Sequence, residues 1–251
     1  MLSVQDLHKS YQVGKTTYEV LKGVSLEVAK GEFVAVMGPS GSGKTTLLNC
    51  ISCYIPADSG SIRLGSQELA RLDEDTLAAV RNKKLGFVFQ DFNLLDTFSL
   101  RDNIFLPLVL SHKGHAEMAA RLAPIARQLG IEALLDKYPY EVSGGQKQRA
   151  AVARALITKP EIVLADEPTG ALDSKATTKL LRMFGEINRG GQTILMVTHS
   201  TRAASHAGRV LFIKDGVVFH QLYRGNMTSD EMFAKIGDTL TMLTTGGADR
   251  G

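Results

Sequence analysis

A run of glycine, serine, lysine and threonine over residues 38–46 has the types and spacing of a phosphate-binding loop. Its sequence, Gly-Pro-Ser-Gly-Ser-Gly-Lys-Thr-Thr, fits the pattern G-x-x-x-x-G-K-[ST]. The apolar residues 33–37 before it predict a strand, and residues 47–49 continue as a helix. This order points backbone N–H groups at the phosphates of a nucleotide. In such a loop Lys44 reaches the β- and γ-phosphates and the Thr45 hydroxyl holds Mg²⁺. The segment therefore predicts a nucleoside-triphosphate site.

Two adjacent carboxylates follow a segment with the composition of a buried strand. Asp166 and Glu167 come directly after the apolar run 162–165, Ile-Val-Leu-Ala. A carboxylate at the C-terminal tip of a buried parallel strand lies beside the phosphate loop. We expect Asp166 to hold Mg²⁺ through water and Glu167 to act on the γ-phosphate as a general base. The alternative, a pair of solvated loop charges, is disfavoured by the strand that precedes them.

A second glycine-containing segment, 142–149, reads Val-Ser-Gly-Gly-Gln-Lys-Gln-Arg. Ser143 is of the type that caps a helix N-terminus, and Gly144 and Gly145 let backbone N–H groups approach an anion closely. One monomer does not need two phosphate-binding helix starts. The economical hypothesis is that this segment covers the γ-phosphate held by another subunit.

Together these segments resemble the nucleotide-binding domain of ABC transporters, over nearly the whole chain up to about Tyr223. The signature motif of that family usually has Leu where this sequence has Val142, a conservative difference. The resemblance implies that Gln90 contacts Mg²⁺ and the attacking water, and that His199 contacts the γ-phosphate. It also implies that Tyr11 stacks on adenine; the alternative for this side chain is an ordinary surface aromatic.

The resemblance implies ATP and Mg²⁺ as cofactors and three overlapping sets of site residues. The catalytic set is Glu167, His199, Gln90 and Lys44. The metal set is Thr45, Gln90 and Asp166. The cofactor-binding set is Tyr11, Gly38, Ser40, Gly41, Ser42, Gly43, Lys44, Thr45, Thr46, Gln90, Ser143, Gly144, Gly145, Gln146 and Asp166.

The resemblance also implies how such a subunit works. Two copies sandwich two ATP molecules, and ATP hydrolysis drives an opening that pulls on a separate transmembrane permease. Residues 171–173 resemble the loop that crosses the interface between the copies. An aromatic and aliphatic loop needs a partner surface, so the candidates for the permease contact are the apolar residues Phe92, Leu94, Leu95 and Phe98. The alternative for these four is packing within the helical part of the same chain.

Several segments indicate which branch of the family this sequence resembles. Residues 86–95 resemble the branch that serves FtsX-like permeases, which includes macrolide exporters and lipoprotein-release systems. Residues 136–139, 170–175 and 212–216 are closer to Bce-type ATPases of bacitracin and antimicrobial-peptide resistance. The implied function is ATP hydrolysis that energises an FtsX-like permease for bacitracin- or lantibiotic-like peptide resistance or export. The alternatives are a lipoprotein-release or macrolide-export ATPase, and a soluble ABC ATPase without a transport role.

Composition is ordinary for a soluble globular protein, with 44% hydrophobic and 22% charged residues among 251. The net charge of +3 is too small to indicate a nucleic-acid partner. No apolar run approaches the roughly 18 residues that span a bilayer, and the N-terminus lacks the order of a signal peptide. We therefore expect a cytoplasmic chain, and the resemblance implies that its permease holds it at the cytoplasmic face of the membrane. Cys50 and Cys53 lack the partners of a zinc site and are predicted to be buried or half-buried helix residues.

Alternating strands and helices predict an α/β core with a parallel sheet, and the resemblance implies a P-loop NTPase of ABC ATPase type. We expect a mixed sheet core with an antiparallel β subdomain and a helical subdomain at about 91–160. The nucleotide-binding domain is predicted at 1–223 and a helical or disordered tail at 224–251. Strands are expected at 2–7, 19–28, 32–37, 61–64, 85–90, 161–166, 192–198, 209–214 and 217–221, and helices at 73–81, 101–110, 116–129, 143–158 and 229–243.

Overall fold

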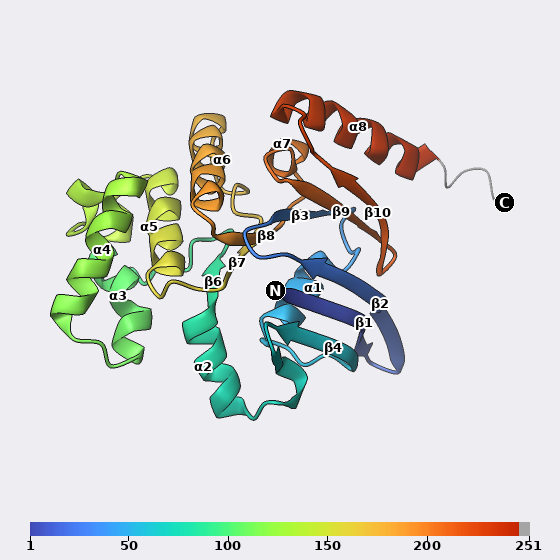
Figure 1. The fold of residues 1–251 in the computed structure, drawn as a ribbon, viewed down its shortest axis with the longest axis horizontal. Helices are drawn as coiled ribbons and strands as arrows, with labels where there is room; N and C mark the ends of the chain where they lie inside the picture. Colours follow the sequence, from blue (N-terminus) through green and yellow to red (C-terminus); the bar gives the residue numbers. More distant parts are fainter. Residues whose placement is uncertain (246–251) are drawn as a thin grey trace.

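A computed structural model describes the backbone of residues 1–245 and the side chains up to residue 242. Its central sheet has six strands in the order β10-β9-β3-β8-β7-β6. These are β3 (Phe33–Met37), β6 (Leu85–Val88), β7 (Ile162–Asp166), β8 (Thr193–Val197), β9 (Arg209–Lys214) and β10 (Val217–Tyr223). Neighbouring strands from β9 to β6 are parallel, and only β10 is antiparallel to its neighbour. The continuous apolar runs of β3, β7 and β8 suit strands covered on both faces. Because these strands, labelled in Figure 1, are parallel, their carboxyl ends share one edge of the sheet, and the predicted site residues 38–46, 166–167 and 199 lie at or just beyond those ends.

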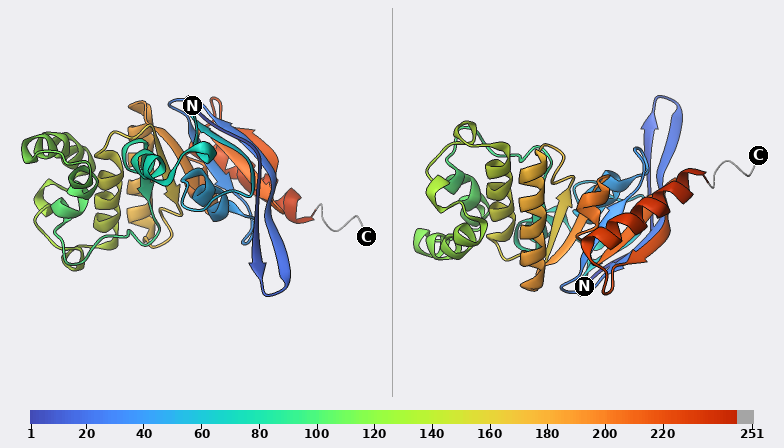
Figure 2. Two further views of the ribbon diagram at one scale, coloured as in Figure 1. Left: turned by 90° about the horizontal axis from the view of Figure 1, so that it is seen from below. Right: turned by 90° about the horizontal axis from the view of Figure 1, so that it is seen from above.

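A second, antiparallel sheet has the order β2-β1-β4-β5. Its strands are β1 (Leu2–Val13), β2 (Thr16–Val28), β4 (Ser59–Leu64) and β5 (Gln67–Glu68). The predicted strands at 2–7 and 19–28 cover only the buried part of β1 and β2. Beyond them the two strands run on as a hairpin that extends past the rest of the molecule (Figure 2). The hairpin residues are exposed on both faces, so no alternation of apolar and polar residues marks them.

Three helices gather at one end of the molecule, away from the antiparallel sheet (Figure 1). They are α3 (Leu100–Leu110), α4 (His115–Leu129) and α5 (Gly144–Leu156), and no strand lies between them. The others are α1 (Lys44–Ile51), α2 (Glu74–Lys84), α6 (Ser174–Arg189), α7 (Thr201–Ala204) and α8 (Ser229–Thr245). The subdomain and tail boundaries remain a prediction, and the end expected to be disordered, 246–251, lies outside the described residues. No described helix is long and apolar enough to cross a bilayer.

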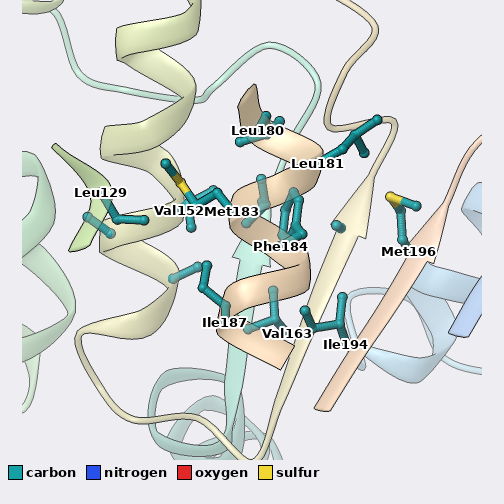
Figure 3. Packing of buried hydrophobic residues seen from close by; sticks show 14 of the residues in the cluster. Leu129, Val152, Val163, Leu180, Leu181, Met183, Phe184, Ile187, Ile194 and Met196 are labelled. Atoms are coloured by element: carbon teal, nitrogen blue, oxygen red, sulfur yellow. The ribbon is translucent and has the colours of Figure 1, made fainter. Parts of the chain in front are cut away.

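Helix α6 packs against the central sheet and was not among the expected elements. Its buried face carries Phe184, which lies between α5 and the strands that carry Val163 and Ile194 (Figure 3). Phe184 is 1% exposed and its ring lies 6.4 Å from that of Phe33 on β3. Apolar residues at helical spacing form this face, so the sequence does contain the signal for α6.

Truncating Phe184 to alanine is expected to lower the free energy of unfolding by about 3–5 kcal/mol, because it opens a cavity between helix and sheet. Chemical denaturation followed by circular dichroism measures this. The control is Phe219→Ala on β10, where the side chain is 60% exposed and the change is expected to be within about 0.5 kcal/mol. Equal losses in the two variants would contradict this account of the core.

The expectation that Cys50 and Cys53 both lie on the helix after the phosphate loop is wrong for Cys53. Helix α1 ends at Ile51, and Cys53 lies beyond it with a positive φ of 57°. Cys50 is buried and Cys53 is half-buried. Burial raises the pKa of each thiol to about 11, so neither has the thiolate character of a redox centre.

Candidate active site

The phosphate loop joins β3 to α1 and is shaped by its glycines. A Cβ at Gly38 would lie 2.1 Å from the carbonyl oxygen of Ile213, so the loop can leave β3 only because Gly38 has no side chain. Gly43 has a φ of 97°, in the left-handed region that favours glycine. The loop backbone is therefore held against its neighbours, and α1 begins directly at Lys44.

The groups inside the loop fit a polyanion. Lys44 is 9% exposed as a whole residue, and its ammonium group donates to the carbonyl oxygens of Gly38 at 2.9 Å and Pro39 at 2.8 Å. Burial lowers the pKa of Lys44, and the nearby carboxylates of Glu167 and Asp166 oppose that shift. Within the described residues, the buried hydroxyl of Ser42 has no hydrogen-bond partner. A buried cation and an unpaired hydroxyl at a helix N-terminus are suited to phosphate oxygens.

Asp166 and Thr45 meet beside this loop, as the metal set requires. Asp166 is the last residue of β7, and its Oδ1 lies 3.5 Å from the Thr45 hydroxyl at the start of α1. Burial raises the pKa of Asp166, and so does the adjacent carboxylate of Glu167. A half-buried carboxylate beside a hydroxyl provides the hard oxygen ligands that Mg²⁺ prefers. The residues present therefore fit a magnesium ion.

Replacing Asp166 with asparagine is expected to stabilise the nucleotide-free protein more at high pH than at low pH. Because the pKa of Asp166 is raised on folding, the folded wild type binds more protons than the unfolded chain above the usual aspartate pKa. Its free energy of unfolding therefore falls as pH rises through the raised pKa. The asparagine variant does not lose this free energy of unfolding. Its melting temperature, relative to that of wild type, is therefore expected to rise between about pH 4 and pH 8.

Thermal unfolding at a series of pH values tests this expectation. Asp96→Asn, on the exposed loop before α3, is the control for the substitution itself. A difference between Asp166→Asn and wild type that is constant with pH would contradict the expected effect.

Glu167 is held by the chain segment that follows β8. Its Oε1 accepts from the backbone N–H of His199 and lies near His199 Nδ1, both at 2.8 Å, and its Oε2 accepts from the Thr198 hydroxyl at 3.0 Å. Glu167 itself has a φ of 44°, a strained value for a residue with a side chain, of the kind found at functional sites. The Glu167 side chain is 14% exposed and that of His199 is 73% exposed. The predicted base and the predicted histidine are therefore direct partners.

Gln90 lies two residues beyond β6, which ends at Val88 rather than at the predicted residue 90. Its side chain covers Gly170: a Cβ there would lie 3.0 Å from Gln90 Cδ. Gly170 in turn donates its N–H to the carbonyl oxygen of Glu167 at 2.9 Å. The structure thus places the Gln90 loop against the loop that follows Glu167, the predicted base.

The signature segment caps α5. Ser143 Oγ accepts from the Gln146 N–H at 3.4 Å, and Gln146 Oε1 accepts from the Ser143 N–H at 2.7 Å. A Cβ at Gly145 would lie 2.9 Å from the Cβ of Ala176, so glycine permits the close approach of α6. In Figures 1 and 2 α5 and α1 lie on opposite sides of α6. The predicted site residues of one chain therefore fall into two separate groups, with Ser143–Gln146 apart from the phosphate loop.

Tyr11 lies on the exposed outer part of the β1–β2 hairpin. It is 40% exposed, pairs across the strands with Tyr18, and Lys9 Nζ lies 5.8 Å from its ring centroid. Its face is thus accessible for stacking, and its role in adenine binding remains a prediction.

Two further residues, not among the predicted ones, contact the site. Thr198 donates its hydroxyl to Glu167, and its place directly after β8 and before His199 is the signal that could have identified it. Gln148 bonds to the backbone beside Gln90 and beside Glu167. It lies within the glycine-containing segment 142–149, but nothing in that segment shows which backbone it contacts.

Comparison with known proteins decides the family. The family described as ABC transporter matches residues 21–170, which includes the phosphate loop, the signature segment and both carboxylates. The chain belongs to the ABC transporter family. It is an ATP-binding and ATP-hydrolysing subunit of that family, as the sequence predicts.

Individual ABC relatives match nearly the full chain. It is 51% identical over 244 residues to the ABC transporter ATP-binding protein YxdL of Bacillus subtilis (strain 168), covering 97% of this chain and 94% of that protein. It is 47% identical over 244 residues to the bacitracin export ATP-binding protein BceA of Halalkalibacterium halodurans, covering 97% and 96%. The resemblance to Bce-type ATPases is therefore confirmed.

Solved ABC cassettes share the fold. The dimeric structure of MJ0796, a bacterial ABC transporter cassette, aligns with a TM-score of 0.82 at 38% identity over 89% of this chain and 98% of that one. A dimeric post-hydrolysis state of the same cassette, bound to ADP and Pi, aligns with a TM-score of 0.81. The predicted fold class is confirmed.

Proposed function

We propose that this chain energises a separate FtsX-like permease that exports, or confers resistance to, a bacitracin- or lantibiotic-like peptide. The observation that carries this proposal is the 47% identity to a bacitracin export ATP-binding protein over almost the full length of both chains. A macrolide export ATP-binding/permease protein of Syntrophobacter fumaroxidans is 43% identical, but the match covers only 31% of that larger protein. Macrolide export is therefore the weaker candidate.

In the proposed mechanism Lys44 leaves the carbonyl oxygens of Gly38 and Pro39 and binds the phosphate oxygens of ATP. Mg²⁺, when bound, would neutralise charge on the β- and γ-phosphates. Thr45, Asp166 and Gln90 are the residues that would hold it, Asp166 through water. Tyr11 would stack on adenine, and the remaining loop residues would donate backbone N–H groups to the phosphates.

Glu167 would act as the general base. An ionised carboxylate has about four lone-pair sites, and the His199 and Thr198 contacts use three of them. The remaining site is available to accept a proton from water. His199 would then stabilise the charge that develops on the γ-phosphate. The same contacts that orient the carboxylate thus hold the histidine at the site.

A second copy of this chain would complete each nucleotide site. The separation of Ser143–Gln146 from the phosphate loop supports this, since α5 and α1 lie on opposite sides of α6 within one chain (Figures 1 and 2). The similarity to cassettes solved as dimers supports it further. Each ATP would then lie between one copy's phosphate loop and the other copy's Ser143–Gln146.

The permease contact is proposed at the loop before α3. Leu95 and Phe98 are 45% and 40% exposed, whereas Phe92 and Leu94 are half-buried and Leu94 packs against the core. The buried side chain of Asn103 holds this loop rigid, since it accepts from the Leu95 N–H at 2.7 Å and donates to the Leu95 carbonyl at 3.0 Å. The exposure of Leu95 and Phe98 supports a permease contact for these two, and the packing of Leu94 supports a role within the helical part of the same chain.

Affinity purification from detergent-solubilised membranes of the organism that carries the gene tests the proposal. An FtsX-like permease is expected to copurify, and loss of this chain is expected to increase sensitivity to bacitracin-like peptides. Copurification with a permease of another type, or unchanged peptide sensitivity, would contradict the proposal.

The contact surface has its own test in the same purification. Leu95→Ser combined with Phe98→Ser is expected to abolish copurification of the permease while the ATP affinity of the purified chain is unchanged, because neither side chain lies at the phosphate loop. The control is Phe219→Ser, an equally drastic change at an exposed aromatic residue on β10. Undiminished copurification with the double variant would place the permease elsewhere.

A further inference from the structure

Gln148 is buried and bonds to the backbone beside both catalytic loops. It is 0% exposed and lies in α5. Its Nε2 donates to the carbonyl oxygen of Phe89 at 3.1 Å and to that of Pro168 at 2.7 Å. Phe89 directly precedes Gln90, and Pro168 directly follows Glu167. One amide group therefore joins the backbone next to the predicted water- and metal-contacting glutamine to the backbone next to the predicted base.

Packing alone does not explain why position 148 is a glutamine, as the oxygen of its amide group shows. Gln148 Oε1 is buried and has no hydrogen-bond partner among the described residues. Leaving a buried acceptor unpaired is costly, and an apolar side chain of the same size would avoid that cost. The two bonds made by the nitrogen are thus what distinguishes glutamine from methionine or leucine at this position.

The two loops joined by Gln148 also touch each other through side chain and backbone. Gln90 lies over Gly170, and the Gly170 N–H bonds to the carbonyl oxygen of Glu167. The relative position of Gln90 and Glu167 therefore depends on how their two backbones are held together. Gln148 is the buried side chain that bonds to both.

We propose that Gln148 is a positioning residue that fixes the Gln90 loop relative to Glu167 and links both loops to α5. The first residues of α5 follow the Ser143 cap, whose proposed target is the ATP held by a second copy. When that contact forms and shifts α5, Gln148 carries the shift to the carbonyl groups of Phe89 and Pro168. When Ser143 contacts the ATP of one nucleotide site, the position of Glu167 in the other site thereby changes. The linking role rests on the proposed sandwich, and the positioning role does not.

The test is Gln148→Met, which keeps the length and approximate volume of the side chain and removes both donors. The kcat for ATP hydrolysis by the full chain is expected to fall about 10- to 100-fold, the scale of a small misplacement of catalytic groups. The KM for ATP and the dissociation constant of Mg-ATP are expected to stay unchanged, because the phosphate loop is untouched.

Gln192→Met is the matched control. Gln192 Nε2 also donates to two backbone carbonyls, those of Pro160 and Thr193, each at 3.2 Å. This glutamine lies at the opposite end of the strands from Glu167, just before β8 begins. The control is expected to lower the melting temperature by a similar amount and to leave kcat unchanged.

Two results would overturn the positioning role. One is a kcat for Gln148→Met that is no lower than that of Gln192→Met. The other is a fall in kcat matched by an equal loss of Mg-ATP affinity, which indicates general loosening. The linking role is tested separately in the Glu167→Gln background by light scattering. If Glu167→Gln dimerises with ATP and the added Gln148→Met does not prevent the dimer, the defect of Gln148→Met lies in hydrolysis, as proposed. If Glu167→Gln alone stays monomeric, the proposed sandwich is wrong. The kcat measurement still decides the positioning role in that case.

Gln148→Glu is a second variant that does not depend on the methionine protein being well folded. A protonated carboxyl group keeps one O–H donor for the two carbonyls, and the ionised group keeps none. The kcat of this variant relative to wild type is therefore expected to rise as pH falls. A ratio that does not change with pH would count against the positioning role.

Discussion

Replacing Glu167 with glutamine is expected to lower the steady-state rate of ATP hydrolysis by about 10²–10⁴-fold, the usual contribution of a general base. The amide keeps the shape of the side chain and its acceptor for the Thr198 hydroxyl or the His199 N–H, but it cannot accept a proton from water. The phosphate loop and Asp166 are unchanged, so Mg-ATP is expected to bind as tightly as in wild type. Coupled-enzyme turnover and equilibrium binding of a fluorescent ATP analogue measure the two quantities.

The matched control for Glu167→Gln is Glu161→Gln, the same substitution at the other end of β7. Glu161 lies just before that strand and pairs with Lys84 at 3.0 Å on the surface. Such a pair contributes little to stability, so turnover is expected to remain at the wild-type level. Loss of a general base lowers the rate by about 10²-fold or more. A Glu167→Gln variant that retained about a tenth or more of the wild-type rate would therefore show that Glu167 is not the base.

Replacing Ser143 with arginine is expected to abolish ATP-dependent dimerisation and, with it, hydrolysis. Ser143 is exposed at the N-terminus of α5, where a phosphate of the second copy's ATP is proposed to bind. A bulky cationic side chain fills that space and adds positive charge to the positive end of the helix dipole. ATP binding to the monomer is expected to remain, because the chain's own phosphate loop is distant from Ser143.

Loss of the helix cap alone must be separated from loss of the interface. Ser143→Ala removes the cap, which costs about 0.5–2 kcal/mol of stability, and leaves the space open. Both variants lose the cap, and arginine is expected to melt slightly below alanine because of its charge at the positive end of the helix, while only arginine prevents the dimer. Sedimentation velocity with Mg-ATP in the Glu167→Gln background compares them. A dimer that forms equally well with arginine at this position would refute the role of Ser143–Gln146 at the interface.

The sequence predicted the parts of the site that are contiguous. The phosphate loop, the capped start of α5, and the acidic pair at the end of β7 are each set by a few adjacent residues, and the structure brings Thr45, Asp166, Glu167 and His199 together as those motifs imply. The fold class followed from the alternation of buried strands and amphipathic helices. The site motifs and the fold class were both predicted from local patterns, because residues close together in the sequence are held close together by one loop, helix or strand.

What the sequence did not predict depends on contacts between distant segments. The bonds of Gln148 to Phe89 and Pro168 span 59 and 20 residues, and no local pattern encodes them. The outer part of the β1–β2 hairpin is exposed on both faces, so its sequence shows no alternation of apolar and polar residues. Cys53 lies outside α1 because the chain takes a left-handed turn there, and cysteine is not a residue that marks such a turn. The roles of the individual site residues remain predictions.

Light scattering of Glu167→Gln with and without Mg-ATP decides whether two copies of this chain share each ATP. Blocking hydrolysis lets the closed state accumulate if it exists. If the two copies share ATP, we expect a monomer without nucleotide and twice that mass with Mg-ATP, with the shift abolished by Ser143→Arg. A protein that is saturated with Mg-ATP and still has the mass of one chain would contradict this expectation.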